Sequence, residues 1–355
     1  MKKLLTLALA AVLACTAFTA SLADKSGAYE YRLNPDNTAT ITDADSELKD
    51  GNIPAEIIGH KVTAIETNAF FSMRSLTDVV IPEGVKTLGQ YTFHACRNLK
   101  TVAIPDSLEE IGEGSFSDCD KIPAFRVSPN HPVFAVNNKA LINTRDMVLL
   151  KYADAKPGDY EVGWGIKRIG VGAFSRSKLK SITLPATVTE IGPTAFADCS
   201  NLQEITLPET LTSIGHQAFI HCHRLKSVTI PDSVTSIDVG VFGWCENMKT
   251  VQISPEHPVF EMNGPLLINK QAKKVINCLS SVKGKCEIPD GIEMIDSMAF
   301  AGCWNLKELT IPESVKVIST DAFLECKKLV IKAPAGSYAQ KFCGWNGIKF
   351  EPLSE

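Results

Sequence analysis

RLKSVTIPDSVTSIDVGVFGWC, residues 224–245, is the clearest copy of a unit that repeats along this chain of 355 residues. The same spacing of apolar residues returns in NLKTVAIPDSLEEIGEGSFSDC (98–119), NLQEITLPETLTSIGHQAFIHC (201–222) and NLKELTIPESVKVISTDAFLEC (305–326). The common pattern is L-x-x-[IVL]-x-[IL]-P-x-x-[VL]-x-x-I-x(4)-F-x-x-C. A unit this short cannot bury its own apolar face, so the repeat predicts coils that stack on one another as a solenoid.

Each copy of the unit predicts its own local structure. Val228 and Ile230 alternate with polar residues, which is typical of a strand with one buried face. Pro231 has no backbone N–H and ends that strand. A compact turn then carries Phe242 and Cys245 inward. The strands of successive coils are expected to lie parallel, about 4.8 Å apart.

Phenylalanines at one position mark successive coils, and their spacing shows a duplication. Most neighbours lie 22 or 23 residues apart, but two gaps span 58 residues, and the first arrangement returns 126 residues later. The chain is therefore a duplicated block in which short coils are followed by one long coil. The sequence predicts nine or ten coils and one continuous buried column formed by Phe70, Phe93, Phe116, Phe174, Phe196, Phe219, Phe242, Phe300 and Phe323.

The two long gaps share a motif, SPNHPVF at 128–134 and SPEHPVF at 254–260. It places His131 and His257 between prolines, which favour an extended or turning backbone. Two equivalent histidines several coils apart cannot share a metal ion. We therefore interpret both as architectural residues rather than as catalytic or metal-binding ones.

The IP-x-x-V-x-x-I-x(3)-AF-x-x-C core of nearly every coil resembles the BspA-like leucine-rich repeat family of cell-surface proteins. YEYRLNPDNTATIT (29–42) resembles the N-terminal hairpin cap of that family, and PAGSYAQKFCGWNGIKF (334–350) resembles its closing turn and helix. The resemblance implies a curved, mainly β solenoid with parallel strands. It also implies long coils that contain a hairpin, with His131 and His257 where the family usually has asparagine.

The expected organisation follows from these features. A signal peptide would occupy residues 1–23 and an N-terminal cap residues 24–52. The solenoid would span residues 53–333, with long coils near 122–165 and 248–292. A C-terminal cap with a short helix would occupy residues 334–355.

The first residues predict export. MKKLLTLALAAVLACTAFTASLAD has two lysines, an apolar run and then small residues, which is the layout of a secretory signal cleaved after Ala23. The alternative is a lipobox that leaves a lipid anchor on Cys15. No later stretch is apolar over the ~20 residues that a membrane helix needs, so we expect a secreted or cell-surface protein without a transmembrane segment.

The charge balance argues against two classes of partner. The formal net charge is −4, and it becomes −6 without residues 1–23, which contain Lys2 and Lys3 and no acidic residue. This balance does not favour nucleic acid or an anionic membrane surface.

Eleven cysteines in an exported chain invite a search for disulfides. One repeat position holds seven of them, which we interpret as a ladder of packed free thiols: Cys96, Cys119, Cys199, Cys222, Cys245, Cys303 and Cys326. Cys278 and Cys286 differ, because the residues 126 positions earlier are Tyr152 and Tyr160. Their joint replacement suggests that the two positions touch. Cys278 and Cys286 are thus a candidate disulfide, with two packed thiols as the alternative.

Motifs that carry chemistry are not evident. The sequence has no G-x-S-x-G, no H-E-x-x-H and no phosphate-binding glycine loop, so we expect no enzyme, no cofactor and no metal site. His216, His221 and His223 lie close in sequence, but their spacing matches no standard zinc site. We interpret them as surface residues.

The polar face of the strands is the candidate binding surface. Such a broad face suits contact with another macromolecule. The strand-face candidates are Lys100, Lys180, Lys226, Lys249, Lys307, Thr206 and Thr229. Trp244 and Trp304, with His94, offer an aromatic strip on the turns, or else pack between them. The family resemblance implies adhesion to extracellular matrix proteins or host cells. The alternative is a surface or periplasmic scaffold that assembles with other proteins.

Overall fold

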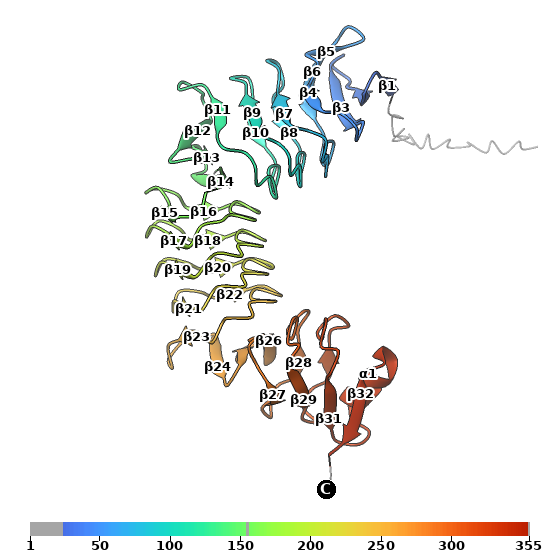
Figure 1. Cartoon of the computed structure of the whole chain (residues 1–355), viewed down its shortest axis with the longest axis vertical. Helices are drawn as coiled ribbons and strands as arrows, with labels where there is room; N and C mark the ends of the chain where they lie inside the picture. Colours follow the sequence, from blue (N-terminus) through green and yellow to red (C-terminus); the bar gives the residue numbers. More distant parts are fainter. Residues whose placement is uncertain (1–23, 154–155, 354–355) are drawn as a thin grey trace, which may run out of the picture.

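The computed structural model describes residues 24–153 and 156–353, and it is a parallel β-solenoid whose coils form an arc (Figure 1). The chain begins with an antiparallel hairpin of β1 (Asp24–Ser26), β2 (Tyr29–Leu33) and β3 (Ala39–Ala44). It closes with α1 (Tyr338–Asn346), capped by Ser337, and with β32 (Lys349–Pro352). The predicted fold class, with both caps, is confirmed.

Each coil has three sides. One side, here called the strand face, stacks the longer strands in parallel. It consists of β4 (Asp50–Asn52), β7 (Asp78–Val80), β9 (Thr101–Ile104), β11 (Phe125–Val127), β15 (Asp159–Glu161), β17 (Ser181–Thr183), β19 (Glu204–Thr206), β21 (Ser227–Ile230), β23 (Thr250–Ile253), β27 (Gly284–Glu287), β29 (Leu306–Thr310), β31 (Val330–Ala333) and β32.

The second side stacks shorter strands. The turn between the two sides starts at the repeat proline, whose carbonyl accepts a backbone hydrogen bond from the residue three positions on, as between Pro231 and Val234 at 3.0 Å. The second side consists of β6 (His60–Ile65), β8 (Thr87–Leu88), β10 (Glu110–Ile111), β14 (Val148–Tyr152), β16 (Arg168–Ile169), β18 (Glu190–Ile191), β20 (Ser213–Ile214), β22 (Ser236–Ile237), β26 (Lys274–Cys278), β28 (Met294–Ile295) and β30 (Val317–Ile318). A short β5 (Glu56–Ile57) pairs with β6.

The third side is a turn that carries the repeat phenylalanine and cysteine, here called the turn edge. In coil after coil the second residue beyond the phenylalanine is left-handed, for example His221 (φ 58°), Trp244 (φ 56°) and Glu325 (φ 63°). Behind it, six of the seven ladder thiols donate to the phenylalanine carbonyl of the preceding coil, as Cys245 does to Phe219 at 3.1 Å, while Cys303 faces the carbonyls of Cys278 and Leu279. The ladder cysteines are therefore packed hydrogen-bond donors as well as small apolar residues.

Two long coils divide the arc into three straight segments (Figure 1). Their hairpins are β12 (Phe134–Asn137) with β13 (Ala140–Asn143), and β24 (Phe260–Asn263) with β25 (Leu266–Asn269). The segments, here called N-terminal (24–127), middle (140–253) and C-terminal (266–353), have separate hydrophobic clusters. Figure 1 shows the turn edge on the inside of the arc and the strand face on its outside.

Two quantitative expectations were wrong. The solenoid has about 14 turns rather than nine or ten, because the caps and the long coils add turns without the marker phenylalanine. The phenylalanine column is also not continuous. Phe196, Phe219 and Phe242 stack with ring centroids 5.0 and 5.6 Å apart, but the stack ends at Phe242, where the long coil turns the axis. Phe300 begins a new stack with Phe323 at 5.3 Å.

Candidate functional site

The strand-face lysines do not form one row along the whole arc. In the middle segment the backbone N–H of Lys249 donates to the carbonyl of Lys226 at 2.9 Å, and Lys226 follows Gln203, which follows Lys180. These three lysines therefore stand in one column at the entrance to the strands. Lys100 lies in the N-terminal segment and Lys307 in the C-terminal one. All five are exposed.

Two threonines complete the expected strand surface. Thr206 on β19 and Thr229 on β21 are exposed, and the Thr229 hydroxyl donates to Gln252 on the next strand at 2.8 Å. Both therefore lie on the same polar face as the lysine column, one coil apart.

At the second bend the middle and C-terminal segments meet along their turn edges. The Trp244 backbone N–H donates to the carbonyl of Ala301 at 3.4 Å. A Cβ atom on Gly302 would lie 2.8 Å from the Trp244 ring, so only glycine allows this approach. Gln217 donates to the Met298 sulfur at 3.0 Å. The inside of this bend is thus closed by direct packing.

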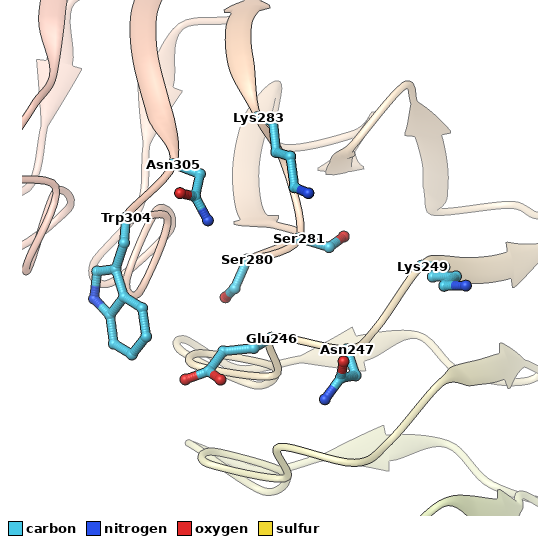
Figure 2. Close-up of a pocket in the computed structure, with 8 residues that line it drawn as sticks. All are labelled: Glu246, Asn247, Lys249, Ser280, Ser281, Lys283, Trp304 and Asn305. Atoms are coloured by element: carbon cyan, nitrogen blue, oxygen red, sulfur yellow. The ribbon is translucent and has the colours of Figure 1, made fainter.

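Beside these contacts the same bend leaves a cleft of about 500 Å³, shown in Figure 2. Glu246, Asn247 and Lys249 line it from the middle segment, and Ser280, Ser281, Lys283, Trp304 and Asn305 line it from the other side. A second hollow of about 360 Å³ shares Asn247 and Lys249 with it and adds Gln203, Arg224 and Lys226. Two of the predicted lysines therefore border one depression. Arg224 and Lys283 were missed, because nothing in their local sequence places them beside that column.

The cations around this depression form no ion pair with any residue that the structure describes. Among the described residues, no ion pair involves Arg224, Lys226, Lys249 or Lys283, although several other surface lysines are paired. The one carboxylate in the lining, that of Glu246, lies 3.4 Å from His223. The depression therefore presents a positive field to an incoming ligand.

At the first bend the side chain of Lys151 is buried, and its Nζ donates to the carbonyl of Gly172 at 3.4 Å and to Ser175 at 3.3 Å. Burial lowers the pKa of Lys151 below its ordinary value. Arg176 lies 3.9 Å from Asp120 at the same bend. Sequence reasoning missed Lys151, since a lone lysine in a strand signals nothing.

The aromatic residues of the turns are partly committed to structure. The indole nitrogens of Trp244 and Trp304 donate to the same oxygen of Glu325, at 3.2 and 3.0 Å. These two bonds hold the pKa of Glu325 below its usual range. Trp244 also stacks on His221 with centroids 4.8 Å apart, and burial lowers the pKa of that histidine. Trp244 therefore packs between the turns instead of contributing to an exposed aromatic strip.

The other two members of the expected aromatic strip are Trp304, which is partly exposed, and His94, which lies in another segment. Trp304 keeps 40% of its surface exposed. His94 lies in the N-terminal segment and stacks on Phe71, with ring centroids 5.1 Å apart. The three residues therefore do not form a single strip.

The paired histidines of the long coils have an architectural role. The Nδ1 atom of His257 accepts the backbone N–H groups of Val259 and Phe260, each at 3.1 Å, and its Nε2 atom lies 3.1 Å from the carbonyl oxygen of Pro231. His131 makes the equivalent three contacts. Each ring thus fixes the start of a hairpin and ties it to the preceding coil. Over the parts of the chain that the structure covers, no group of three possible metal ligands converges.

Cys278 and Cys286 lie together as expected. Both are buried free thiols in the structure, and each perturbs the pKa of the other. The Cys278 thiol lowers the pKa of Cys286, while burial raises that of Cys278. The equivalent Tyr152 and Tyr160 also touch, with ring centroids 4.5 Å apart. The disulfide itself stays a prediction.

The targeting predictions concern a part of the chain outside the described residues. Both the cleavage site after Ala23 and the lipid anchor on Cys15 fall there. Within residues 24–153 and 156–353, no helix has the length and apolar character required to cross a membrane.

Three solved structures illustrate what the chain is similar to. A leucine-rich repeat protein from Bacteroides ovatus is 21% identical, with 93% of this chain and 76% of that chain covered and a TM-score of 0.40. A leucine-rich cell surface protein from Faecalibacterium prausnitzii is 21% identical, with 92% and 97% covered and a TM-score of 0.35. The pneumococcal vaccine antigen PcpA is 16% identical, with 94% and 99% covered and a TM-score of 0.47. No curated protein matches the sequence at a significant level.

The repeat itself decides the family. The family model described as the BspA type leucine-rich repeat region matches in six copies, over residues 46–153, 167–265 and 268–337. These ranges cover most of the chain and include coils from all three segments. The chain therefore belongs to the BspA-type leucine-rich repeat family.

Proposed function

We propose that this protein is an exported, non-enzymatic repeat protein that binds other proteins through its strand face, as an adhesin for extracellular matrix proteins or host cells. The observation that carries the proposal is the column of exposed lysines in the middle segment, which has no ion-pair partner among the described residues. Proteins of this family are surface or secreted proteins, which fits the signal sequence at residues 1–23.

The side chains of the cleft support a binding role over a catalytic one. Ser281 donates its hydroxyl to the carbonyl of Met248 at 2.6 Å, and Ser280 donates to that of Ala301 at 3.2 Å. An activated nucleophile would instead donate to a general base. Both serines therefore serve to hold the bend.

The test uses residues 24–355, made without the signal sequence, over immobilised extracellular matrix proteins and over intact host cells. Saturable retention that weakens as salt rises supports the proposal, because exposed charges are screened at high ionic strength. The alternative function is a surface or periplasmic scaffold. It predicts no retention on any matrix protein or cell, together with capture of proteins from the cell envelope of the producing organism.

A further inference from the structure

The second bend holds a cleft of a size that suits a ligand. Its volume is about 500 Å³, and it lies between the middle and C-terminal segments. That volume lies in the range of ~300–1,000 Å³ typical of sites for small ligands. A short stretch of a longer chain can therefore enter it.

The charges of the cleft specify the sign of the ligand. Lys226 and Lys249 lie on neighbouring coils, about 4.8 Å apart in the stacking direction. Lys283 reaches the same space from the C-terminal side (Figure 2), and Arg224 borders it from the middle segment. Cations without an ion pair stand on both walls. They can bind carboxylates placed between them, because each cation then gains a counter-charge that it lacks among the described residues.

The uncharged side chains of the cleft indicate which hydrogen-bonding and apolar groups a ligand should have. Asn247 uses its amide N–H on the carbonyl of His223 at 2.6 Å, which leaves its oxygen as an acceptor. Asn305 has no side-chain partner among the described residues and so has both a donor and an acceptor available. The indole N–H of Trp304 donates to Glu325, so Trp304 offers a ligand the apolar surface of its ring. The lining thus offers donors, acceptors and an apolar surface together.

We propose that the depression at the second bend, formed by the cleft and the hollow beside it, binds an acidic, extended segment of a protein partner, with its carboxylates between Lys226, Lys249 and Lys283. This rests on the proposed function, since it names the chemistry of the partner. A peptide backbone both donates and accepts hydrogen bonds, and so matches the asparagines as well as the lysines. A sulfated glycan offers mainly acceptors and dense charge, which Glu246 in the lining opposes.

The experiment selects peptides from a random library displayed on phage, with residues 24–355 as bait. Enriched peptides are then synthesised with a fluorescent label, and their affinity is measured by anisotropy. The test variant is Lys249→Glu with Lys283→Glu. The matched control is Lys61→Glu with Lys341→Glu, which changes the net charge equally at exposed positions outside both the lining and the strand face. Thermal melts of each variant verify folding, and Lys249→Ala with Lys283→Ala gives a milder second variant.

The expected result is enrichment of peptides rich in Asp and Glu, with affinity reduced about tenfold or more by the test variant and little by the control. Enriched peptides without acidic residues, no enrichment, or equal loss in both variants would overturn the proposal. A heparin oligosaccharide that binds through Lys249 and Lys283 while no acidic peptide does would replace it with a glycan site. Retention on matrix proteins that survives the test variant would defeat the cleft proposal and leave the proposed function standing.

Discussion

Trp304 donates its indole N–H to Glu325 across 3.0 Å, from one coil of the C-terminal segment to the next. Trp244 donates to the same carboxylate oxygen from the middle segment. Glu325 therefore ties the C-terminal segment to Trp244 of the middle segment, which lies 81 residues earlier in the sequence.

The first prediction is that the titration of Glu325 is reported by both indole N–H groups. Both bonds favour the ionised carboxyl, which lowers the pKa of Glu325 below 4.5. The stabilisation is thus present above pH 4.5 and is lost as pH falls through the lowered value. We expect the indole N–H resonances of Trp244 and Trp304 to shift together in that window. Glu325→Gln should abolish the shift, and Trp345 on α1 serves as the unaffected reference. Two indole signals that ignore the titration would contradict the contact.

The second prediction concerns the core of the middle segment. Phe219 is fully buried between Phe196 and Phe242, so Phe219→Ala should cost about 3–5 kcal/mol of unfolding free energy in a denaturant melt. Phe71→Ala, at a side chain that is 51% exposed, should cost below about 1 kcal/mol. Since the three segments have separate cores, melts recorded by different probes should be compared for coincidence. A comparable loss in the two variants would refute the stacked column.

Much of this architecture could be predicted because it is local and repeated. The repeated phenylalanine and cysteine positions, such as Phe219 and Cys245 of successive coils, predict the structure of each coil and the way it stacks on its neighbours. The bends could not be predicted, since the angle of a long coil depends on how its hairpin packs. Consequently the meeting of Trp244 with Gly302 was not foreseen. Three residues that line the depression, Lys226, Lys249 and Trp304, were predicted as candidates because their positions recur in the repeat.

The third prediction is a bond between Cys278 and Cys286. Their thiols touch, and the lowered pKa of Cys286 favours the thiolate that attacks a disulfide during exchange. Peptide mapping of protein exported by its native host, without reductant, should recover the two cysteines linked. The ladder cysteines should be free, since burial raises the pKa of Cys96 and of Cys326 to about 12. The bond closes a short loop, so its reduction should cost less than the ~3 kcal/mol expected from chain entropy for a 15-residue loop. Recovery of Cys278 and Cys286 as free thiols would exclude the bond.

The fourth prediction concerns the buried lysine of the first bend. Burial disfavours the charged form of Lys151 and so lowers its pKa from the ordinary value of 10.5. The free-energy cost of burying this lysine therefore falls as pH rises from neutral toward 10.5, and it grows as pH falls. Lys151→Met should leave stability at pH 7 unchanged or raise it by about 1 kcal/mol. The gap between variant and wild type should narrow toward pH 10. A gap that widens with pH would mean that the ammonium group is stabilised at this site.

The last prediction compares the two faces of the arc. Lys226→Glu, Lys249→Glu and Lys307→Glu reverse exposed charges on the strand face. Phe71→Ala and Leu324→Ala remove exposed apolar side chains at equivalent positions of the turn edge. All five substitutions lie outside the cores and should leave the melts intact.

Binding through the strand face is tested most sharply by the retention of these two variants on an immobilised matrix protein that holds the wild type, measured at low and at physiological salt. We predict that charge reversal weakens retention, and more so at low salt, while the turn-edge variant behaves as wild type. Retention that survives charge reversal and disappears in the turn-edge variant would contradict strand-face binding and move the binding surface to the inside of the arc.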